Sequence, residues 1–306
     1  MNSAGTLRRQ LRRLRFWPTG VGLALLRVLG LLPMPVLAAL GAALGMMLYA
    51  VHGERRNVVR VNIARCFPRL SRRARARLVR AHFKAFGQAL VDIAVAWWAS
   101  GARLRRLVRF KGREHYDRAI GGGRPVILLA PHFVGLEIGG IRLSMERPMV
   151  AMFRHPANEL LRGVMQRARA RFGLRLVEHK RPLTALVRQV RAGLPLYYLP
   201  DQDAGRRNGI FVPFFDIPTA TYPVLGRLAR LADATVIPCI TRQLPRGRGY
   251  EIEFGAPLAN FPSGDARADT EHMNRAIERA VRETPEQYFW VHKRFKTRPR
   301  GEAPFY

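Results

Sequence analysis

Two side chains that can exchange protons follow one short apolar segment of the sequence. The run "RPVILLA" is typical of a buried strand, and the "PHFVGLE" that follows places His132 five residues before Glu137. On one continuous helix, at about 100° per residue, these two side chains would point roughly 140° apart. We therefore predict that His132 lies on the loop that leaves the strand and Glu137 in the first turn of the next helix, where they can meet.

Such a pair is suited to removing a proton from a hydroxyl group. A histidine with an ordinary pKa of about 6.5 accepts a proton near neutral pH. Glu137 would orient the imidazole and stabilise its cation, and a helix N-terminus keeps such a carboxylate ionised. The activated hydroxyl would attack an acyl carbon, with N–H groups or arginines balancing the oxyanion. The alternative is an ordinary loop histidine whose hydrogen bonds are satisfied locally.

Two further polar clusters follow predicted strands. Arg154 and Asn158 lie in "FRHPAN", and Asp201 and Asp203 lie in "LPDQDAG". Because ligands bind outside the carboxyl ends of the strands in α/β sheets, we expect these clusters to converge with His132 on one cleft. A structural role is an equal alternative for the two aspartates, which would then join a turn to neighbouring arginines.

Other kinds of chemistry lack a sequence signal. The eight histidines show no metal-ligand spacing, and no serine lies in a nucleophile elbow. The glycines of "AIGGGRP" precede the strand and lack the spacing of a phosphate loop, so they indicate a turn. The sequence therefore offers no metal site and no obvious agent of covalent catalysis.

The elements that must position these residues are short strands alternating with helices, which favours an α/β fold with a central sheet flanked by helices. A break at Pro68 precedes a long helix whose N-cap we assign to Ser71. We divide the chain into a membrane-anchoring segment, 1–51, and a catalytic domain, 52–306. The five predicted strands are 125–130, 148–153, 194–200, 235–241 and 250–255.

The N-terminal segment indicates a membrane. Residues 1–16 read as a basic amphipathic helix, and residues 21–51 are apolar except for Arg27 and two prolines. Residues 35–51 reach only the lower limit of about 17 residues for a spanning helix, so spanning and resting on one leaflet both remain open. A signal peptide and a buried core helix are the alternatives, and we favour membrane association.

Composition limits the partners. The chain has 306 residues, 48% of them hydrophobic, and a net charge of +32. A folded protein of this charge is expected to bind acidic partners: nucleic acid, an anionic membrane, or an acidic protein or lipid. Cys66 and Cys239 are too few and too distant for a disulfide framework, so we interpret them as reduced core residues.

Much of the chain resembles a known family. "HFVGLE" is similar to the H-x4-D/E motif of the lysophospholipid acyltransferase superfamily, and a series of further segments resembles its lipid A late acyltransferase branch, of the lauroyl and myristoyl type. The likeness covers most of residues 20–300. The segments, in order, are "RVNIARCFP", "FRHPAN", "LPDQDAG", "GIFVPFFDIPTAT", "LARLADATVIP" and "PEQYFWVHKRFKTRP".

The resemblance implies a mixed sheet of the lysophospholipid acyltransferase type and a specific reaction. Enzymes of this family lie on the cytoplasmic face of the bacterial inner membrane. They move an acyl chain from acyl carrier protein to a hydroxyl on an acyl chain of a Kdo-bearing lipid A precursor, without a covalent intermediate. Because thioester chemistry of this kind needs no metal, we expect no obligatory cofactor. His132 would be the general base and Glu137 its partner.

The resemblance also implies the substrate site. Its residues would be Arg154, Asn158, Asp201, Asp203 and Thr221, with Arg154 on a phosphate or the oxyanion.

In "QYFWVHKRFKTRPRG" aromatic residues alternate with the basic residues Lys293, Arg294, Lys296 and Arg298. We expect them to contact phosphorylated lipid or the acidic carrier protein, together with anionic lipids of the inner membrane. A nucleic-acid stacking platform and a solvated basic face are the alternatives, and we expect no nucleic-acid partner.

Departures from the family pattern leave the acceptor open. Asp216 stands where a small residue is common. Tyr222 and Pro223 stand where small and hydroxyl residues are common, and Val224 stands where glycine is often found. Acyl chain length, acylation position and oligomeric state are not predicted. An acyltransferase for another glycolipid or aminolipid, and a non-catalytic basic membrane-tethered binder of anionic lipid or nucleic acid, are the alternative functions.

Overall fold

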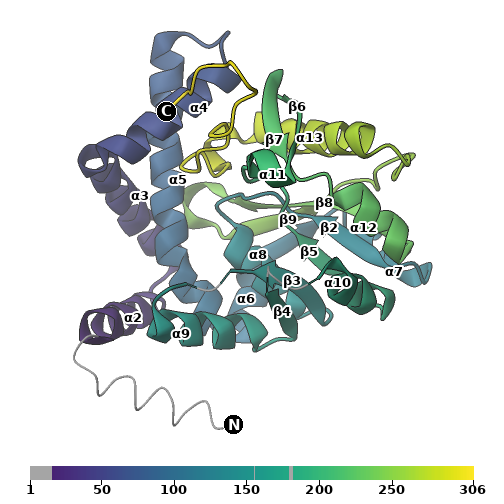
Figure 1. The fold of residues 1–306 in the computed structure, drawn as a ribbon. Coiled ribbons are helices and arrows are strands. Elements are labelled where there is room, and N and C mark those ends of the chain that lie inside the picture. The colour runs from purple at the N-terminus through teal and green to yellow at the C-terminus, as the bar shows by residue number, and fades with distance from the viewer. Residues whose placement is uncertain (1–15, 155, 179–181) are drawn as a thin grey trace.

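A seven-stranded sheet forms the centre of the protein in the computed structural model, which describes residues 16–154, 156–178 and 182–306 (Figure 1). The strand order is β1-β9-β8-β2-β5-β3-β4, and every neighbouring pair is parallel except β8 and β9. The predicted mixed α/β sheet is therefore confirmed. The strands are β1 (Val108–Lys111), β2 (Val126–Leu129), β3 (Met149–Phe153), β4 (Leu174–Glu178), β5 (Leu196–Tyr198), β8 (Thr235–Gln243) and β9 (Tyr250–Phe254).

All five predicted strands are present, and four further strands were not predicted. The edge strands β1 and β4, "VRFK" and "LRLVE", mix charged with apolar residues because each has only one neighbour in the sheet. The strands β6 (Ile210–Phe214) and β7 (Ile217–Thr221) form a separate antiparallel hairpin. Each strand of this hairpin contains a proline, Pro213 or Pro218, and the two lie opposite each other. Because proline within an apolar run argues against a strand, neither strand was predicted.

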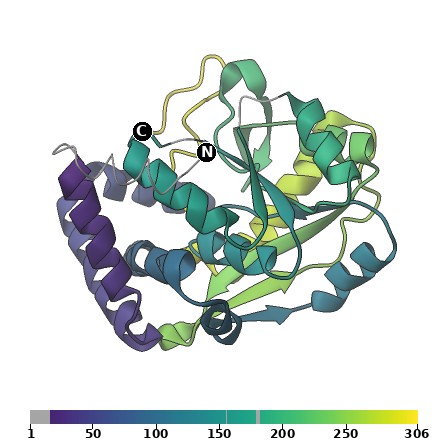
Figure 2. The same ribbon diagram turned by 90° about the horizontal axis from the view of Figure 1, so that it is seen from below.

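Helices cover both faces of the sheet (Figures 1 and 2). The long helix α5 begins as predicted, since the hydroxyl of Ser71 accepts a hydrogen bond from the N–H of Ala74. The described helices are α2 (Trp17–Leu29), α3 (Met34–Val51), α4 (Gly53–Cys66), α5 (Arg72–Trp98), α6 (Gly101–Leu107), α7 (Arg113–Gly121), α8 (Leu136–Ser144), α9 (Glu159–Ala170), α10 (Leu183–Arg191), α11 (Gly205–Asn208), α12 (Leu225–Ala232) and α13 (Ala266–Glu283), with 3₁₀ turns η2 (Pro245–Gly247) and η3 (Pro285–Gln287).

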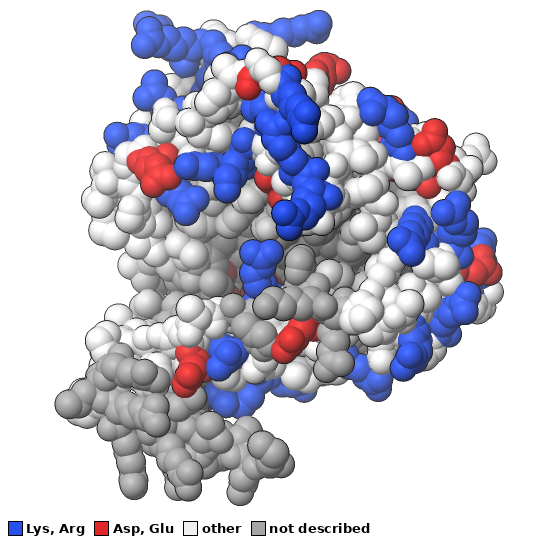
Figure 3. Space-filling model, viewed as in Figure 1, with Lys and Arg blue, Asp and Glu red and all other residues white. Residues whose placement is uncertain are grey.

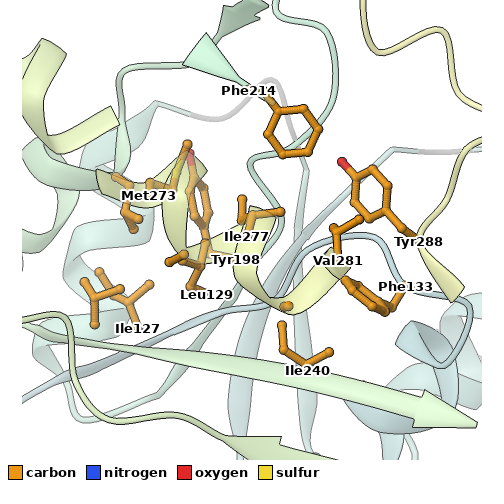
Figure 4. Packing of buried hydrophobic residues seen from close by; sticks show 14 of the residues in the cluster. Ile127, Leu129, Phe133, Tyr198, Phe214, Ile240, Met273, Ile277, Val281 and Tyr288 are labelled. Carbon is orange, nitrogen blue, oxygen red and sulfur yellow. The ribbon is translucent and has the colours of Figure 1, made fainter. Parts of the chain in front are cut away.

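The central strand β2 is buried on both faces. Side chains alternate along a strand, so Ile127 and Leu129 contribute to the core under α10, α12 and α13, and Val126 and Leu128 to the core under α5, α7 and α8. Figure 4 shows the first of these cores, where α13 packs on the sheet. Cys66 and Cys239 are buried free thiols, as predicted.

The N-terminal helices pack on the outside of α5. One described helix, α3, is long and apolar enough to cross a membrane by length and composition. The predicted basic helix over residues 1–16 lies outside the described residues except for Phe16. The domain boundary that we predict at residue 51 coincides with the end of α3 and stays a prediction.

A buried histidine in α5 makes stability depend on pH. His82 is fully buried, and its Nδ1 lies 3.0 Å from the carbonyl oxygen of Glu286. Burial lowers the pKa of His82 to about 4, and the bond to the Glu286 carbonyl opposes this shift only partly. Below pH of about 6.5 the unfolded chain takes up a proton that the folded chain refuses, so the free energy of unfolding falls as pH drops towards 4.

We expect His82→Gln to remove this pH dependence. Between pH 6.5 and 4, the free energy of unfolding of the variant should fall by up to about 1.4 kcal/mol less per pH unit than that of wild type, because uptake of one proton contributes this slope. Denaturant unfolding of both proteins across this range measures the slope. An equal slope in the two proteins would show that His82 does not titrate as described.

Candidate active site

His132 lies at the carboxyl end of β2. The strand ends at Leu129, the N–H of Ala130 still donates to the carbonyl of Tyr198 in β5, and the chain then turns through Pro131 before α8 begins. Glu137 lies in the first turn of α8. The predicted placement, with the histidine on the loop and the glutamate at the helix start, is confirmed.

Asp201, and not Glu137, is the carboxylate that holds His132. The Nδ1 atom of His132 is 2.7 Å from Oδ1 of Asp201, and the backbone N–H of His132 donates to Oδ2 at 2.9 Å. Burial raises the pKa of Asp201, but the facing His132 and its hydrogen bonds outweigh burial and leave the pKa of Asp201 below its ordinary value. An ionised carboxylate accepts only, so Nδ1 carries the proton and Nε2 presents a lone pair.

The pair is shielded on one side and open on the other. The side chain of Asp201 is 1% exposed and that of His132 is 20% exposed. The Nε2 atom of His132 lies 3.1 Å from the amide nitrogen of Gln202, which donates to it. His132, Asp201 and Gln202 line a small pocket. Its other lining residues are Asn62, Tyr288, Phe289, Trp290, His292 and Arg294.

Glu137 faces the opposite direction from the one we predicted. Its carboxylate accepts from Nε1 of Trp97 at 2.7 Å and forms a bidentate ion pair with Arg169, with a shortest distance of 2.6 Å. The first turn of α8 packs between α5 and α9, so the side chain points to these helices. The predicted pairing of Glu137 with His132 is corrected to His132 with Asp201.

Beside Glu137 and Arg169 lies a narrow pocket whose remaining lining is mainly apolar: Leu136, Gly140, Ile141, Ala151, Met152, Leu174, Leu176, Tyr197 and Leu199.

The ion pair between Glu137 and Arg169 predicts a pattern of coupled losses. We expect Glu137→Ala and Arg169→Ala each to lower kcat/KM by about 10- to 100-fold, because each leaves the other half-buried charge without its partner. The double variant should be no worse than the more damaged single variant.

Steady-state kinetics on the four proteins, with Glu137→Gln as a milder substitution, measures this coupling. If Glu137 acted directly on His132 or on substrate, Arg169→Ala would stay close to wild type and only the Glu137 variants would lose activity.

Asp203 has a structural role in the described fold. Its carboxylate accepts from the N–H of Thr297 at 3.1 Å and from the hydroxyl of Thr297 at 2.9 Å, and its own N–H donates to Nε2 of His292. The structural alternative that we left open is therefore the one that fits Asp203. Its partner is Thr297, and not an arginine as that alternative assumed. These bonds tie the loop that carries Asp201 to the C-terminal segment.

Thr221 and Arg294 are buried against each other. The hydroxyl of Thr221 accepts from the guanidinium of Arg294 at 2.8 Å, and the same guanidinium donates to the carbonyl of Ala220 at 2.9 Å. Arg294 is 2% exposed and Thr221 is fully buried. We expected both to contact substrate. In the structure Thr221 is inaccessible, and Arg294 forms one wall of the His132 pocket while it fixes the hairpin β6–β7.

The remaining predicted residues lie on other parts of the fold. Arg154 is exposed after β3. Asn158 caps α9 by accepting from the N–H of Leu161, and its amide donates to the hydroxyl of Thr19 in α2 at 2.9 Å. Lys293 pairs with Glu54 at 3.0 Å. Their assignment to the substrate site stays a prediction.

The unusual Asp216 occupies a hairpin turn. Phe215 and Asp216 both have positive φ, 52° and 61°, between the antiparallel strands β6 and β7. A two-residue turn of this kind favours glycine, asparagine or aspartate. This departure from the family pattern is therefore explained by backbone geometry.

Sequence reasoning missed several residues of the site. Gln202 lies between the two aspartates that we singled out, and its position next to Asp201 was the available signal. Asn62 donates to the carbonyls of Trp290 and His292, which fixes the C-terminal wall of the pocket. Asn62 lies in "RVNIARCFP", which resembles the family, but its role did not follow from that segment. Nothing local marked Arg169, because its partner Glu137 lies 32 positions away in the sequence.

An open groove separates α2 from α9 near this site. Its apolar side chains come from α2, α5 and α9, and Trp97, which donates to Glu137, forms part of its wall. Three arginines also line it: Arg27, Arg167 and Arg171. The combination of apolar surface and guanidinium groups suits a ligand with both hydrocarbon and phosphate.

Comparison with known proteins gives the class of this α/β enzyme. The sequence profile described as bacterial lipid A biosynthesis acyltransferase matches residues 6–297. The chain belongs to this family, and it is therefore an acyltransferase of lipid A biosynthesis.

Named relatives cover nearly the whole chain. The lipid A biosynthesis lauroyltransferase of Escherichia coli is 32% identical over 288 residues, which are 94% of each chain. The palmitoleoyltransferase of the same organism is 32% identical over 95% of each chain, and its myristoyltransferase is 30% identical over 96% of this chain and 92% of its own. The predicted family and enzyme class are confirmed.

Proposed function

We propose that this protein transfers an acyl chain from acyl carrier protein to a hydroxyl on an acyl chain of a Kdo-bearing lipid A precursor, with His132 as general base. The observation that carries the mechanism is the pairing of Nδ1 of His132 with the buried carboxylate of Asp201, which leaves Nε2 facing a pocket. The family supports a lipid A precursor as the acceptor.

The reaction proceeds in one displacement. Nε2 of His132 accepts the proton of the acceptor hydroxyl as its oxygen attacks the thioester carbonyl. The tetrahedral intermediate then expels the thiolate, which takes the proton back from the imidazolium, so that an ester and a free thiol are formed. Asp201 stabilises the imidazolium between these two proton transfers. Arg154 balances the oxyanion or a phosphate, and thioester transfer of this kind needs no metal.

The pocket beside Glu137 suits the acyl chain. Its apolar lining comes from α8, β3, β4 and β5, and the ion pair between Glu137 and Arg169 lies at its wall. Burial of hydrocarbon in such a pocket is favourable by about 0.8 kcal/mol per methylene group. Glu137 and Arg169 are positioning residues in this scheme, since they hold α8 and α9 around the chain.

Charge supports an acidic donor and an anionic membrane. Exposed basic side chains run across the surface where α11 lies, including Arg206 and Arg207 (Figure 3). Their field would attract acidic acyl carrier protein, while Lys293 faces the phosphorylated lipid. We place the enzyme on the cytoplasmic face of the inner membrane, where its donor is found.

An acyl-transfer assay tests this function. Membranes containing the protein, or its His132→Ala variant, are incubated with acyl carrier protein thioesters or the matching coenzyme A thioesters and the tetraacylated Kdo-bearing precursor. Mass spectrometry of the lipid should show one added acyl chain with the carrier-protein donor, and none with the variant.

Two other outcomes would each exclude a part of the proposal. Transfer from the coenzyme A thioester at the same rate would overturn the assignment of acyl carrier protein as the donor. Acylation of an already acylated precursor, another glycolipid or an aminolipid, and not of the tetraacylated Kdo-bearing precursor, would overturn the assigned acceptor but not the mechanism.

A further inference from the structure

The helices α2 and α3 expose an apolar face that the rest of the protein does not cover. Nine of the eleven large hydrophobic side chains that are exposed in the described part of the chain lie between residues 17 and 51. Within each of the two helices they are three, four or seven positions apart, as on one side of a helix. They are Trp17, Val21, Leu25, Val28, Leu31, Val36, Leu40, Met47 and Val51. Figures 1 and 2 place both helices on the same side of the molecule, outside α5.

The opposite face of α3 is fixed to α5. Added Cβ atoms at Gly41 and Gly45 would lie 2.3 Å from Cα of Gln88 and 1.9 Å from the carbonyl oxygen of Phe83, so the two backbones touch. The order of these contacts makes the helices antiparallel. Lys84, which is exposed, therefore lies level with Gly45 near the middle of α3.

Both ends of α3 are held by the same catalytic body. At its start, the guanidinium of Arg103 in α6 donates to the carbonyls of Gly30 and Leu32, and Gly247 of the turn between β8 and β9 abuts Met34. At its end, α4 follows, and Asn62 of α4 donates to the carbonyls beside the His132 pocket. A helix with both ends on one body cannot place them on opposite sides of a bilayer.

The neighbouring helix gives the same result. With 13 residues, α2 is about 20 Å long, against about 30 Å of hydrocarbon. It is joined to α9 by the hydrogen bond between Thr19 and Asn158. If α3 crossed the membrane, α2 and α9 would lie on opposite sides, and Lys84 would be drawn into hydrocarbon, where a charged side chain is costly.

We propose that α2 and α3 lie in the plane of one leaflet as a docking face for an anionic bilayer and do not span it. The charges around the face fit this partner. Exposed arginines lie on α2, at the turn beside the start of α3 and on α4: Arg27, Arg246, Arg248, Arg55 and Arg60. In Figure 3 the surface over α3 is mostly white, with Lys and Arg side chains above it. The proposal depends neither on the acyl donor nor on the general base.

Cross-linking in native membranes tests the arrangement. Cysteines replace Thr19 and Asn158, and a short bifunctional thiol reagent is added to intact membranes; the native cysteines are buried. We expect the double variant, and neither single variant, to form an internal cross-link between α2 and α9. No cross-link in the double variant, with both cysteines labelled singly from opposite sides of the membrane, would establish a span and overturn the proposal.

Vesicle binding tests the face itself. Leu25→Asp on α2 and Leu40→Asp on α3 should each weaken binding to vesicles of phosphatidylethanolamine and phosphatidylglycerol by about tenfold or more, because each places a charge in the leaflet. The matched control is Leu231→Asp, an exposed leucine on α12, which should bind like wild type. Equal binding to phosphatidylcholine vesicles would overturn the anionic preference, and an effect of Leu40→Asp without one of Leu25→Asp would indicate a span.

Discussion

His132→Ala should lower kcat/KM for acyl transfer by about 10²- to 10⁴-fold. In the proposed mechanism the imidazole takes the proton from the acceptor hydroxyl, and positioned general-base assistance contributes a factor of this size. The loss should appear mainly in kcat, because the imidazole acts in the transition state. Initial rates at saturating donor, with the lipid product quantified by mass, measure it.

The matched control is another histidine. His115→Ala alters a half-buried histidine on α7, outside the described site, and should keep a rate within about threefold of wild type. Vesicle binding of His132→Ala should match that of wild type. Its thermal unfolding should shift to lower temperature, because the buried carboxylate of Asp201 loses the imidazole that faces it, so rates are compared at a temperature where both proteins are folded. A His132→Ala enzyme that retained most of its rate would exclude general-base catalysis by this residue and favour a binding role for the protein.

Asp201→Asn should be almost as damaging as loss of the histidine. The substitution keeps the shape of the side chain but removes the negative charge that fixes the proton on Nδ1 and stabilises the imidazolium. A neutral amide behind a catalytic histidine costs up to about 10⁴-fold in serine proteases, where it selects the wrong tautomer. We expect kcat to fall by about 10²- to 10⁴-fold here, again with little change in KM.

Asp203→Asn provides the same chemical change two residues away. Among the residues that the structure describes, this carboxylate accepts its hydrogen bonds from Thr297, so the variant should stay within about tenfold of wild type. Because the folded pKa of Asp201 lies below its ordinary value, the carboxylate contributes stability above pH of about 4, and Asp201→Asn loses that contribution. Unfolding curves therefore accompany the rates. Equal rates for folded Asp201→Asn and wild type would show that Asp201 is not the carboxylate that assists His132, and would favour Glu137 instead.

The sequence predicted the buried strands and the position of His132 on the loop after β2 because their signals are local. Apolar runs flanked by turn residues located all five buried strands, and the loop and helix start after β2 followed from the angle between His132 and Glu137. The charged edge strands β1 and β4 carried no such signal. The hairpin β6–β7 was hidden by its prolines.

The partner of His132 could not be chosen from spacing. Glu137 is near in sequence, but the first turn of α8 directs it to Arg169 and Trp97. Asp201 is 69 positions away and reaches His132 because β5 is the neighbour of β2 in the sheet. Strand order is a property of the whole chain. Our expectation that the clusters after the predicted strands converge with His132 is confirmed for Asp201, but its pairing with His132 was not predicted.

A single-turnover experiment tests the central claim most directly. Purified wild-type protein and His132→Ala are mixed with acyl donor and lipid acceptor, and the masses of the lipid product and of the intact protein are followed together. The account predicts acylated lipid from wild type, no acyl group on the protein at any time, and no product from the variant on the same timescale. An acylated protein that precedes the product, or a variant that forms product at the wild-type rate, would contradict it.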